Sequence, residues 1–178
     1  MSESIQTKTS PFHRGEREIQ ERLGVREQVE EIGRRFIHDH MPDEHRAFYQ
    51  RLPFILVGTV DAQGRPWASL LPGQPGFVHS PDPHTLVIET RPLVGDPLNE
   101  TLSEGADIGL LGIEFVRRRR NRLNGRIQDV HSGGFRVKVS QSFGNCPQYI
   151  QARDLEPRPA IESMAKPRPV ERINLLND

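Results

Sequence analysis

Hydrophobic residues in the first third of the chain recur with the period of an α-helix. Between residues 25 and 36 the apolar positions are spaced by four, three and four residues, and charged residues fill the opposite face. Gly24 is expected to divide the helical stretch around it into two helices. A further short helix is expected from Pro42, a good first helical residue that two acidic residues follow, to about Arg51.

Beyond Pro53 the pattern changes to the short apolar runs and Gly- or Pro-marked turns of β-strands. Six strands are expected, linked mostly by hairpin turns, and a short helix is expected to open at Gly95-Asp96-Pro97. Residues 80–84, which hold two prolines, are expected to form a turn. Antiparallel strands of this number favour a small barrel over a sandwich. The strands are expected at residues 54–60, 66–71, 85–90, 107–115, 117–130 and 135–140.

These patterns divide the chain into four regions. An extended arm is expected at residues 1–14 and helices at residues 15–52. The barrel domain is expected at residues 53–151, followed by a proline-rich tail or linker at residues 152–178. The expected fold class is therefore mainly β with flanking helices (α+β).

The charge and apolar content of the chain restrict the classes of partner that are expected. With 24 basic and 24 acidic residues among 178, the chain is formally neutral. A neutral chain is not held to nucleic acid or a membrane by its overall charge, so we expect neither as a partner. Hydrophobic residues make up only 34% of the chain, which indicates that part of it is extended or depends on a partner. No apolar run resembles a signal peptide or a membrane span, so we expect a cytoplasmic protein.

The first expected hairpin carries side chains that suit a phosphorylated aromatic ligand. Arg65 offers a forked donor, Ser69 offers a hydroxyl, and Trp67 offers a flat stacking surface. Strand alternation places these three residues on one face. The alternative interpretation is a plain hairpin with a solvated arginine and a core tryptophan.

Arginines are concentrated between residues 117 and 126, within an expected strand. Alternation places Arg120 and Arg122 on one face and Arg119 on the other. Several arginines packed into one strand repel each other unless anions or carboxylates neutralise them, so either a bound phosphate or structural salt bridges are expected. An RNA-binding surface is disfavoured, because the chain is neutral and has few aromatic residues on which bases could stack.

Cys146 is the single cysteine of the chain, so it forms no intramolecular disulfide and no metal-binding cysteine pair. Asn145 and Pro147 suit the start of a short helix, where a thiolate is favoured. No histidine has a recognisable relation to this thiol, and an inert cysteine is the alternative to a nucleophile. His38, His40 and His45 lack the spacing of three or four that a metal site on one helix face requires, so no metal is assigned.

Four segments of the chain resemble the pyridoxamine 5'-phosphate oxidase-like flavoproteins, and most closely the branch of predicted flavin-nucleotide-binding proteins. The resemblance extends over about residues 11–151, and its most specific part is the Asn-Cys-Pro segment. The segments are Gly64-Arg-Pro-Trp-Ala-Ser69, Ile108-Gly-Leu-Leu-Gly-Ile-Glu-Phe115, the arginine strand that ends at Gly125, and Ser142-Phe-Gly-Asn-Cys-Pro-Gln-Tyr-Ile150.

The resemblance implies a six-stranded antiparallel split β-barrel that binds FMN, with a homodimer that holds the flavin at its subunit interface. The residues that it places near the flavin ring, ribityl chain and phosphate are Arg65, Pro66, Trp67, Ala68, Ser69, Arg119, Arg120, Arg122, Asn145 and Cys146.

The function that the resemblance implies is that of an FMN-dependent oxidoreductase, which transfers hydride or electrons to a small molecule, with NAD(P)H or a reductase as electron donor. The alternative is a non-catalytic module that binds flavin or another phosphorylated ligand. Two departures matter: Arg91-Pro92 stands where the oxidase has a phosphate-binding lysine, and the signature for the pyridoxal substrate is absent. Oxidation of vitamin B6 is therefore not expected, and no catalytic side chain is assigned.

Overall fold

The computed structural model describes residues 10–144, 146 and 148–156. Residues 1–9 of the expected arm, Asn145, Pro147 and the part of the expected tail from residue 157 lie outside the described residues.

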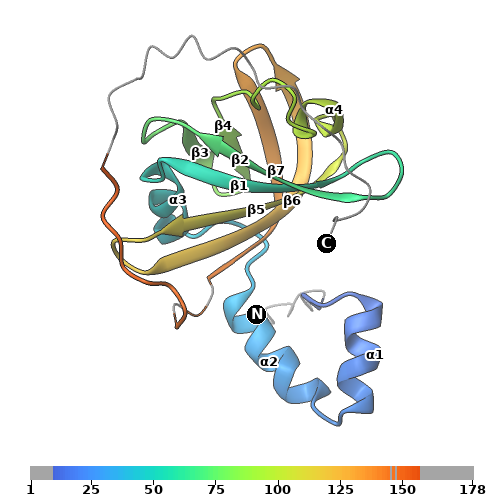
Figure 1. Cartoon of the computed structure of the whole chain (residues 1–178). Coiled ribbons are helices and arrows are strands. Elements are labelled where there is room, and N and C mark those ends of the chain that lie inside the picture. Colours follow the sequence, from blue (N-terminus) through green and yellow to red (C-terminus); the bar gives the residue numbers. More distant parts are fainter. Residues whose placement is uncertain (1–9, 145, 147, 157–178) are drawn as a thin grey trace, which may run out of the picture.

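One antiparallel sheet of seven strands forms the body of the molecule, in the order β2-β1-β5-β6-β7-β4-β3 (Figure 1). It has the split-barrel architecture, with β2 and β3 as its two edge strands. The strands are β1 (Phe54–Val60), β2 (Pro66–Pro72), β3 (Val78–Asp82), β4 (Thr85–Ile88), β5 (Asp107–Glu114), β6 (Arg119–His131) and β7 (Gly134–Gly144).

The expectation of six strands is wrong by one, because β3 forms where a turn was expected. β3 runs through Ser80, Pro81 and Asp82 and pairs with β4, with a register shift between His79 and Asp82. A proline is compatible with this strand because β3 lies at the edge of the sheet, where its missing N–H leaves no ladder bond unmade.

The two longest strands differ from expectation at their ends. β6 begins two residues late, because Arg117 and Arg118 belong to the turn after β5, where Arg118 has a φ of 52°. β7 continues four residues beyond Ser140, because its pairing with β6 runs as far as Asn121 opposite Gly144. The two-residue turn between β6 and β7 is as expected.

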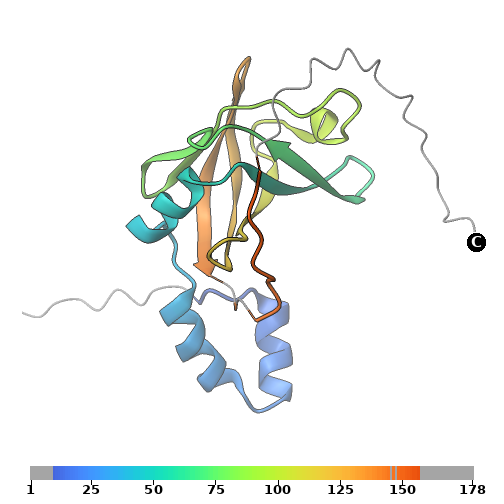
Figure 2. The ribbon, with the colours of Figure 1, turned by 60° about the vertical axis from the view of Figure 1, so that its left-hand side comes forward.

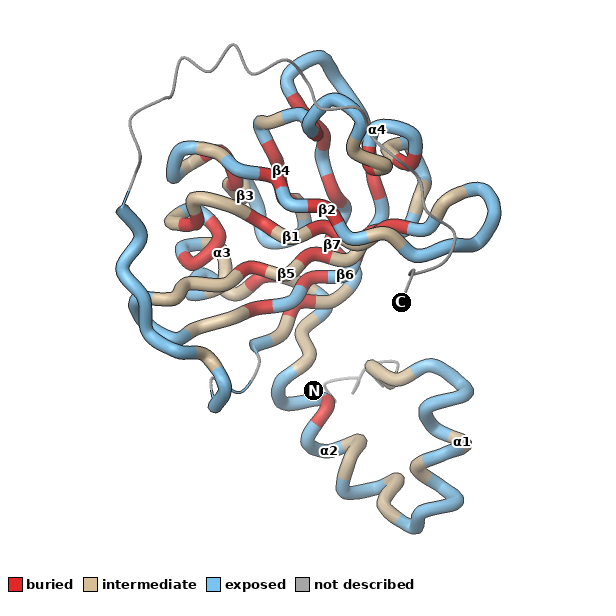
Figure 3. The backbone as a smooth tube through the Cα atoms, viewed as in Figure 1, coloured by how far each residue is buried: buried red, intermediate tan, exposed pale blue. Residues whose placement is uncertain are grey.

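Alternation along the strands separates a buried face from an outer face. In β1, Ile55 and Val57 are buried in the core, where Phe48, Tyr49 and Leu52 also lie. Figure 3 shows buried and less buried positions alternating along the strands. Thr59 is buried on the same side, and the alternate residues of β1 point away from the core, as do their register partners in β2 and β5. We call this side of β1, β2, β5 and β6 the outer face.

The helices lie as the sequence indicates. α1 (Arg14–Arg22) and α2 (Arg26–Phe36) are separated at Gly24, which has a φ of 68°, and α3 (Asp43–Gln50) packs beside β3. α4 (Leu98–Thr101) is the short helix after Pro97. Figure 2 shows that α1 and α2 form a hairpin that projects from one end of the barrel. Among the described residues, no helix combines the length and apolar character that a membrane crossing requires.

Candidate functional site

A shallow cavity of about 450 Å³ lies where β1, β2, β5 and β6 run side by side. Gly58 of β1, Gly109 of β5 and Asn124 of β6 are register partners across three neighbouring strands, and they form the floor of the cavity on the outer face. The remaining lining residues are Thr59, Val60, Pro66, Trp67, Asp107, Ile108, Gly125 and Ser140.

The two floor glycines are not required by the packing of the chain itself. A Cβ atom at Gly58 or at Gly109 would have its nearest neighbour at 3.7 Å, which is ordinary van der Waals contact. Neither residue has a positive φ. By contrast, a Cβ atom at Gly125 would lie 2.3 Å from the backbone oxygen of Lys138. Glycine inside a strand reduces stability by roughly 0.5–1 kcal/mol, and it often marks a place where a ligand or another backbone approaches.

Asp61 fixes the hairpin beside this floor. Its carboxylate accepts hydrogen bonds from Trp67 Nε1 at 2.8 Å and from Arg65 Nε at 2.7 Å, and also from two backbone N–H groups of the turn. The hydrogen bond from Trp67, followed by those from Arg65, holds the pKa of Asp61 well below its ordinary value. The Arg65 guanidinium lies 5.7 Å from the centre of the Trp67 ring. The sequence analysis did not predict this role of Asp61. An aspartate that opens a turn closed by glycine is nevertheless a pattern that favours such hydrogen bonds.

The five expected hairpin residues therefore fall into two groups. Pro66 and Trp67 line the cavity, and Ala68 borders its floor as the register partner of Gly58. Arg65 is engaged by Asp61 instead. Ser69 is buried and donates its hydroxyl to Asp96 Oδ1 at 2.5 Å, so its hydroxyl is not directed at the cavity.

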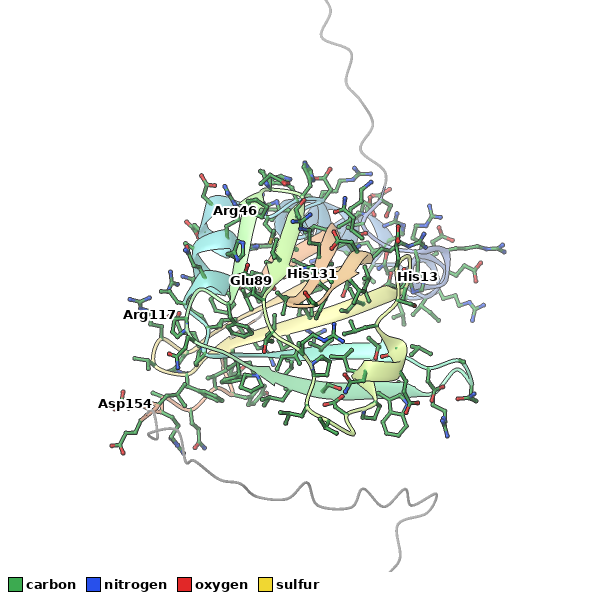
Figure 4. The ribbon with its side chains drawn as sticks, turned by 90° about the horizontal axis from the view of Figure 1, so that it is seen from above. His13, Arg46, Glu89, Arg117, His131 and Asp154 are labelled. Carbon is green, nitrogen blue, oxygen red and sulfur yellow. The ribbon has the colours of Figure 1, made fainter. Side chains whose placement is uncertain are left out.

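The arginine run is distributed over a turn and both faces of β6, so it does not form a single basic surface. Arg117 pairs with Glu114 at 3.2 Å, and Arg118 donates to the backbone oxygen of Ile150 at 2.9 Å. The side chain of Arg119 lies 5.8 Å from the centre of the Phe48 ring. Figure 4 shows Arg117 and Asp154 at the same end of the barrel, opposite the end where His13 lies.

Arg120 and Arg122 lie on the outer face, as strand alternation predicted, and Arg126, which is paired with Asp107, lies on the same face. Neither the Arg120 nor the Arg122 side chain has a hydrogen bond or ion pair to any described residue, and the Nε atom of Arg120 is buried without a partner among them. Arg122 is exposed and lies two residues before Asn124 of the cavity floor. Arg120 lines a neighbouring cavity of about 430 Å³ with Ile113, Phe115, Tyr149, Ile150, Gln151 and Arg153.

The expected helix after Cys146 does not form in the described residues, and this expectation is wrong. Residues 148–156 make a turn and then continue without helical structure. A helix this short has little stability of its own, and here Arg118 binds the backbone oxygen of Ile150. Cys146 is exposed, and the described segment after it provides no helix N-terminus.

Four histidines lie together next to the end of β7, a grouping that the sequence spacing did not reveal. The His38 ring lies 5.6 Å from the His40 ring and 5.9 Å from the His45 ring, and His84 lies 6.0 Å from His40. His45 Nδ1 is hydrogen-bonded to the buried hydroxyl of Ser142 at 2.8 Å. Burial, followed by the nearby charges of other cationic groups, lowers the pKa of His45. Within the described parts of the chain, no three potential ligands are placed to hold a metal ion.

Comparisons with known proteins bear on the resemblance seen in the sequence. A crystal structure of a HupZ variant from Group A Streptococcus is similar, with 14% identity and a TM-score of 0.47, and the match covers 59% of this chain and 99% of that one. No curated protein matches the chain in sequence. The family model described as pyridoxamine 5'-phosphate oxidase matches residues 41–168, which is most of the chain. The chain therefore belongs to the pyridoxamine 5'-phosphate oxidase family.

Proposed function

We propose that this chain binds FMN on the outer face of its sheet, with the flavin ring over the floor formed by Gly58, Gly109 and Asn124. The observation that carries the proposal is the pair of floor glycines, whose lack of side chains the fold does not require. The membership of the family supports flavin as the ligand.

The residues around the floor fit the parts of FMN. A floor that carries only the Asn124 side chain suits a planar ring, and Pro66 and Trp67 of the cavity lining lie beside it. Arg122 lies about 7 Å from Asn124 along the strand, and its guanidinium has no carboxylate partner among the described residues. We assign the phosphate to Arg122, with Arg120 as the second cation, because guanidinium groups bind phosphate in a bidentate manner.

FMN, when bound, supplies hydride or electron transfer, so the proposed activity is that of an oxidoreductase acting on a small molecule. The residues of the chain bind and orient the ring: Asp61 holds the Trp67 indole in place, and the glycine floor sets how closely the ring approaches the sheet. The proposed electron donor is NAD(P)H or a reductase. No side chain is assigned a proton-transfer role.

We also propose that a second copy of the chain completes the site. Near the cavity the outer face carries Val60, which is 60% exposed, and Leu70, which is 46% exposed. Apolar side chains grouped on one face indicate a surface that is covered by a partner. A homodimer that meets on this face would shield the flavin ring from water.

Gly109→Leu tests the position of the ring. The new side chain points into the cavity and meets no other atom closely at its Cβ, so the protein should fold normally and bind FMN at least about tenfold more weakly. Gln128→Leu, which adds the same side chain at an exposed position of β6 away from the cavity, should bind FMN like the wild type. Unchanged FMN affinity in a folded Gly109→Leu protein would contradict this placement.

Arg122→Gln tests the position of the phosphate in the same titration. FMN should bind more weakly, whereas riboflavin, which lacks the phosphate, should bind both proteins equally. Arg136→Gln is the matched control, because Arg136 is an exposed arginine of the neighbouring strand β7 that does not line the cavity and is paired with Asp129. Reduction of bound FMN by NADH or NADPH then distinguishes an oxidoreductase from a module that only binds flavin.

A further inference from the structure

The hairpin of α1 and α2 exposes the apolar side chains that its helical period brings together. Ile19 is 52% exposed, Leu23 70%, Ile32 50% and Phe36 58%. No residue of α1 is buried, and Gly33 is the one buried residue of α2 (Figure 3). Surface helices normally turn such residues toward a core.

Polar contacts hold this hairpin together instead. The Glu30 carboxylate accepts hydrogen bonds from Ser10 at 2.7 Å and from Arg26 at 2.5 Å, and it also pairs with Arg34 at 2.8 Å. The side chains of Glu30 and Arg26 are only 16% and 23% exposed. The ion pairs therefore lie in the more protected part of the hairpin, and the large apolar side chains lie outside.

Both ends of the hairpin are fixed to the end of β7. His38, which follows α2, makes two backbone hydrogen bonds with Ser142, at 3.0 and 2.8 Å. Pro11, which precedes α1, accepts a hydrogen bond from the Gln141 side chain at 2.7 Å. These anchors fix the base of the hairpin beside the cavity floor, because Gln141 also accepts a hydrogen bond from Asn124 at 3.1 Å, and the two helices project from the end of the barrel (Figures 1 and 2).

An uncovered hairpin of this size needs a partner. Helices of nine and eleven residues are shorter than the roughly 12–15 residues at which isolated helices become marginally stable, so their stability depends on packing. The same chain carries a second uncovered apolar surface, at Val60 and Leu70. A second copy of the chain therefore offers an apolar surface against which the exposed side chains of the hairpin can pack.

We propose that the hairpin of α1 and α2 is a dimerisation arm that packs on the outer face of a second copy, beside the glycine floor. This inference rests on the proposed dimer. In a two-fold dimer the arm of each copy packs on the outer face of the other copy, so the contact between arm and outer face forms twice. The six exposed apolar side chains present on the order of 600 Å² per copy, and covering them twice reaches the roughly 1,200 Å² at which specific interfaces begin.

Light scattering on the full-length chain tests the arm. The wild type should have the mass of a dimer, and the double variant Ile19→Gln with Phe36→Gln should shift to monomer while keeping its helical circular dichroism. Val116→Gln is the matched control, because Val116 is 58% exposed in the turn between β5 and β6 and belongs to neither surface, and it should remain a dimer.

Cross-linking tests which surface the arm contacts and does not depend on weakening the dimer. In a Cys146→Ser background, chains with Arg35→Cys, beside Phe36, are mixed with chains with Ala68→Cys, on the outer face, and treated with a bifunctional maleimide. The proposal expects products that contain one chain of each kind. Products of Arg35→Cys with itself alone, or no mixed products, would overturn the proposed contact.

The outcomes separate this inference from the proposed function. A wild-type dimer that persists in the double variant overturns the arm and leaves the dimer standing. A monomeric wild type overturns both the arm and the dimer, whereas FMN binding is measured separately by titration. A wild-type dimer with a monomeric double variant and mixed cross-links supports the arm.

Discussion

At the scale of single residues, burial and hydrogen bonding determine what each side chain contributes. Tyr49 shows this in the core, where its hydroxyl is buried and has no hydrogen-bond partner among the described residues. Burial without a partner raises the pKa of Tyr49 far above its ordinary value. The aromatic ring fills the core beside Phe48, and the hydroxyl reduces the stability that the ring provides.

Tyr49→Phe should therefore stabilise the protein, by about 1 kcal/mol, because it removes an unpaired buried hydroxyl and keeps the ring. Urea unfolding of the two proteins measures the difference, with Phe48→Leu as a core variant that should be less stable than the wild type. A Tyr49→Phe protein that is less stable than the wild type would show that the hydroxyl is hydrogen-bonded.

His45 makes stability depend on pH. Its neighbours are His38, His40, Arg119, Glu44 and the Ser142 hydroxyl, and the first three oppose its protonation. Because its pKa in the folded state lies below the ordinary value of about 6.5, the unfolded chain binds more protons between these two values. Stability should therefore be constant above about pH 6.5 and should fall as the pH drops below that value.

Melting temperatures measured between about pH 7.5 and about pH 5.5 test this expectation. His45→Gln keeps a group that can bind Ser142 but does not titrate, so its melting temperature should change less over this range. The carboxylates with a lowered pKa, such as Asp61 and Glu30, lose their contribution only at more acidic pH. An equal change in both proteins would contradict a role for His45.

At the scale of elements, periodicity in the sequence located most strands and helices and missed those that depend on position in the sheet. β1 was predicted with its observed bounds, because its apolar run is bounded by proline and a turn. β3 was missed because prolines at residues 81 and 83 read as a turn, and only its place at the sheet edge makes it a strand.

The glycine floor was missed for a related reason. Gly109 lies inside an apolar run, where it reads as part of a strand, and its place beside Gly58 follows from the pairing of β1 with β5. The histidine group likewise joins residues from separate parts of the chain, such as His40 and His84. Sequence spacing predicts contacts within an element, and these sites lie between elements.

A pair of glycine substitutions tests the role of the strands. Gly58→Ala should leave stability unchanged or raise it by up to about 1 kcal/mol, because the new Cβ atom has room and alanine loses less backbone entropy. Gly125→Ala should destabilise by about 1–3 kcal/mol or more, because its Cβ atom would collide with the backbone of β7. Thermal unfolding measures both changes in stability. Equal effects would contradict the claim that Gly58 has room for a side chain whereas Gly125 is packed against the backbone of β7.

At the scale of the whole molecule, the hairpin of α1 and α2 and the outer face near Val60 and Leu70 both expose large apolar side chains. The low apolar content of 34% is consistent with a chain that stabilises itself partly through a partner. The sequence predicted the split barrel and the family through motifs in its strands, and the family match confirms both. The arm and the floor became visible only when the elements were placed in space.

The central claim is that the glycine floor binds FMN, and titration of the purified chain with FMN tests it most directly. Trp67 is the single tryptophan of the chain and lines the cavity, so its fluorescence should be quenched as the flavin binds. We expect saturable quenching and a shifted flavin absorption band, with one FMN per chain at saturation. Absence of saturable quenching or of any change in the flavin spectrum would contradict the account.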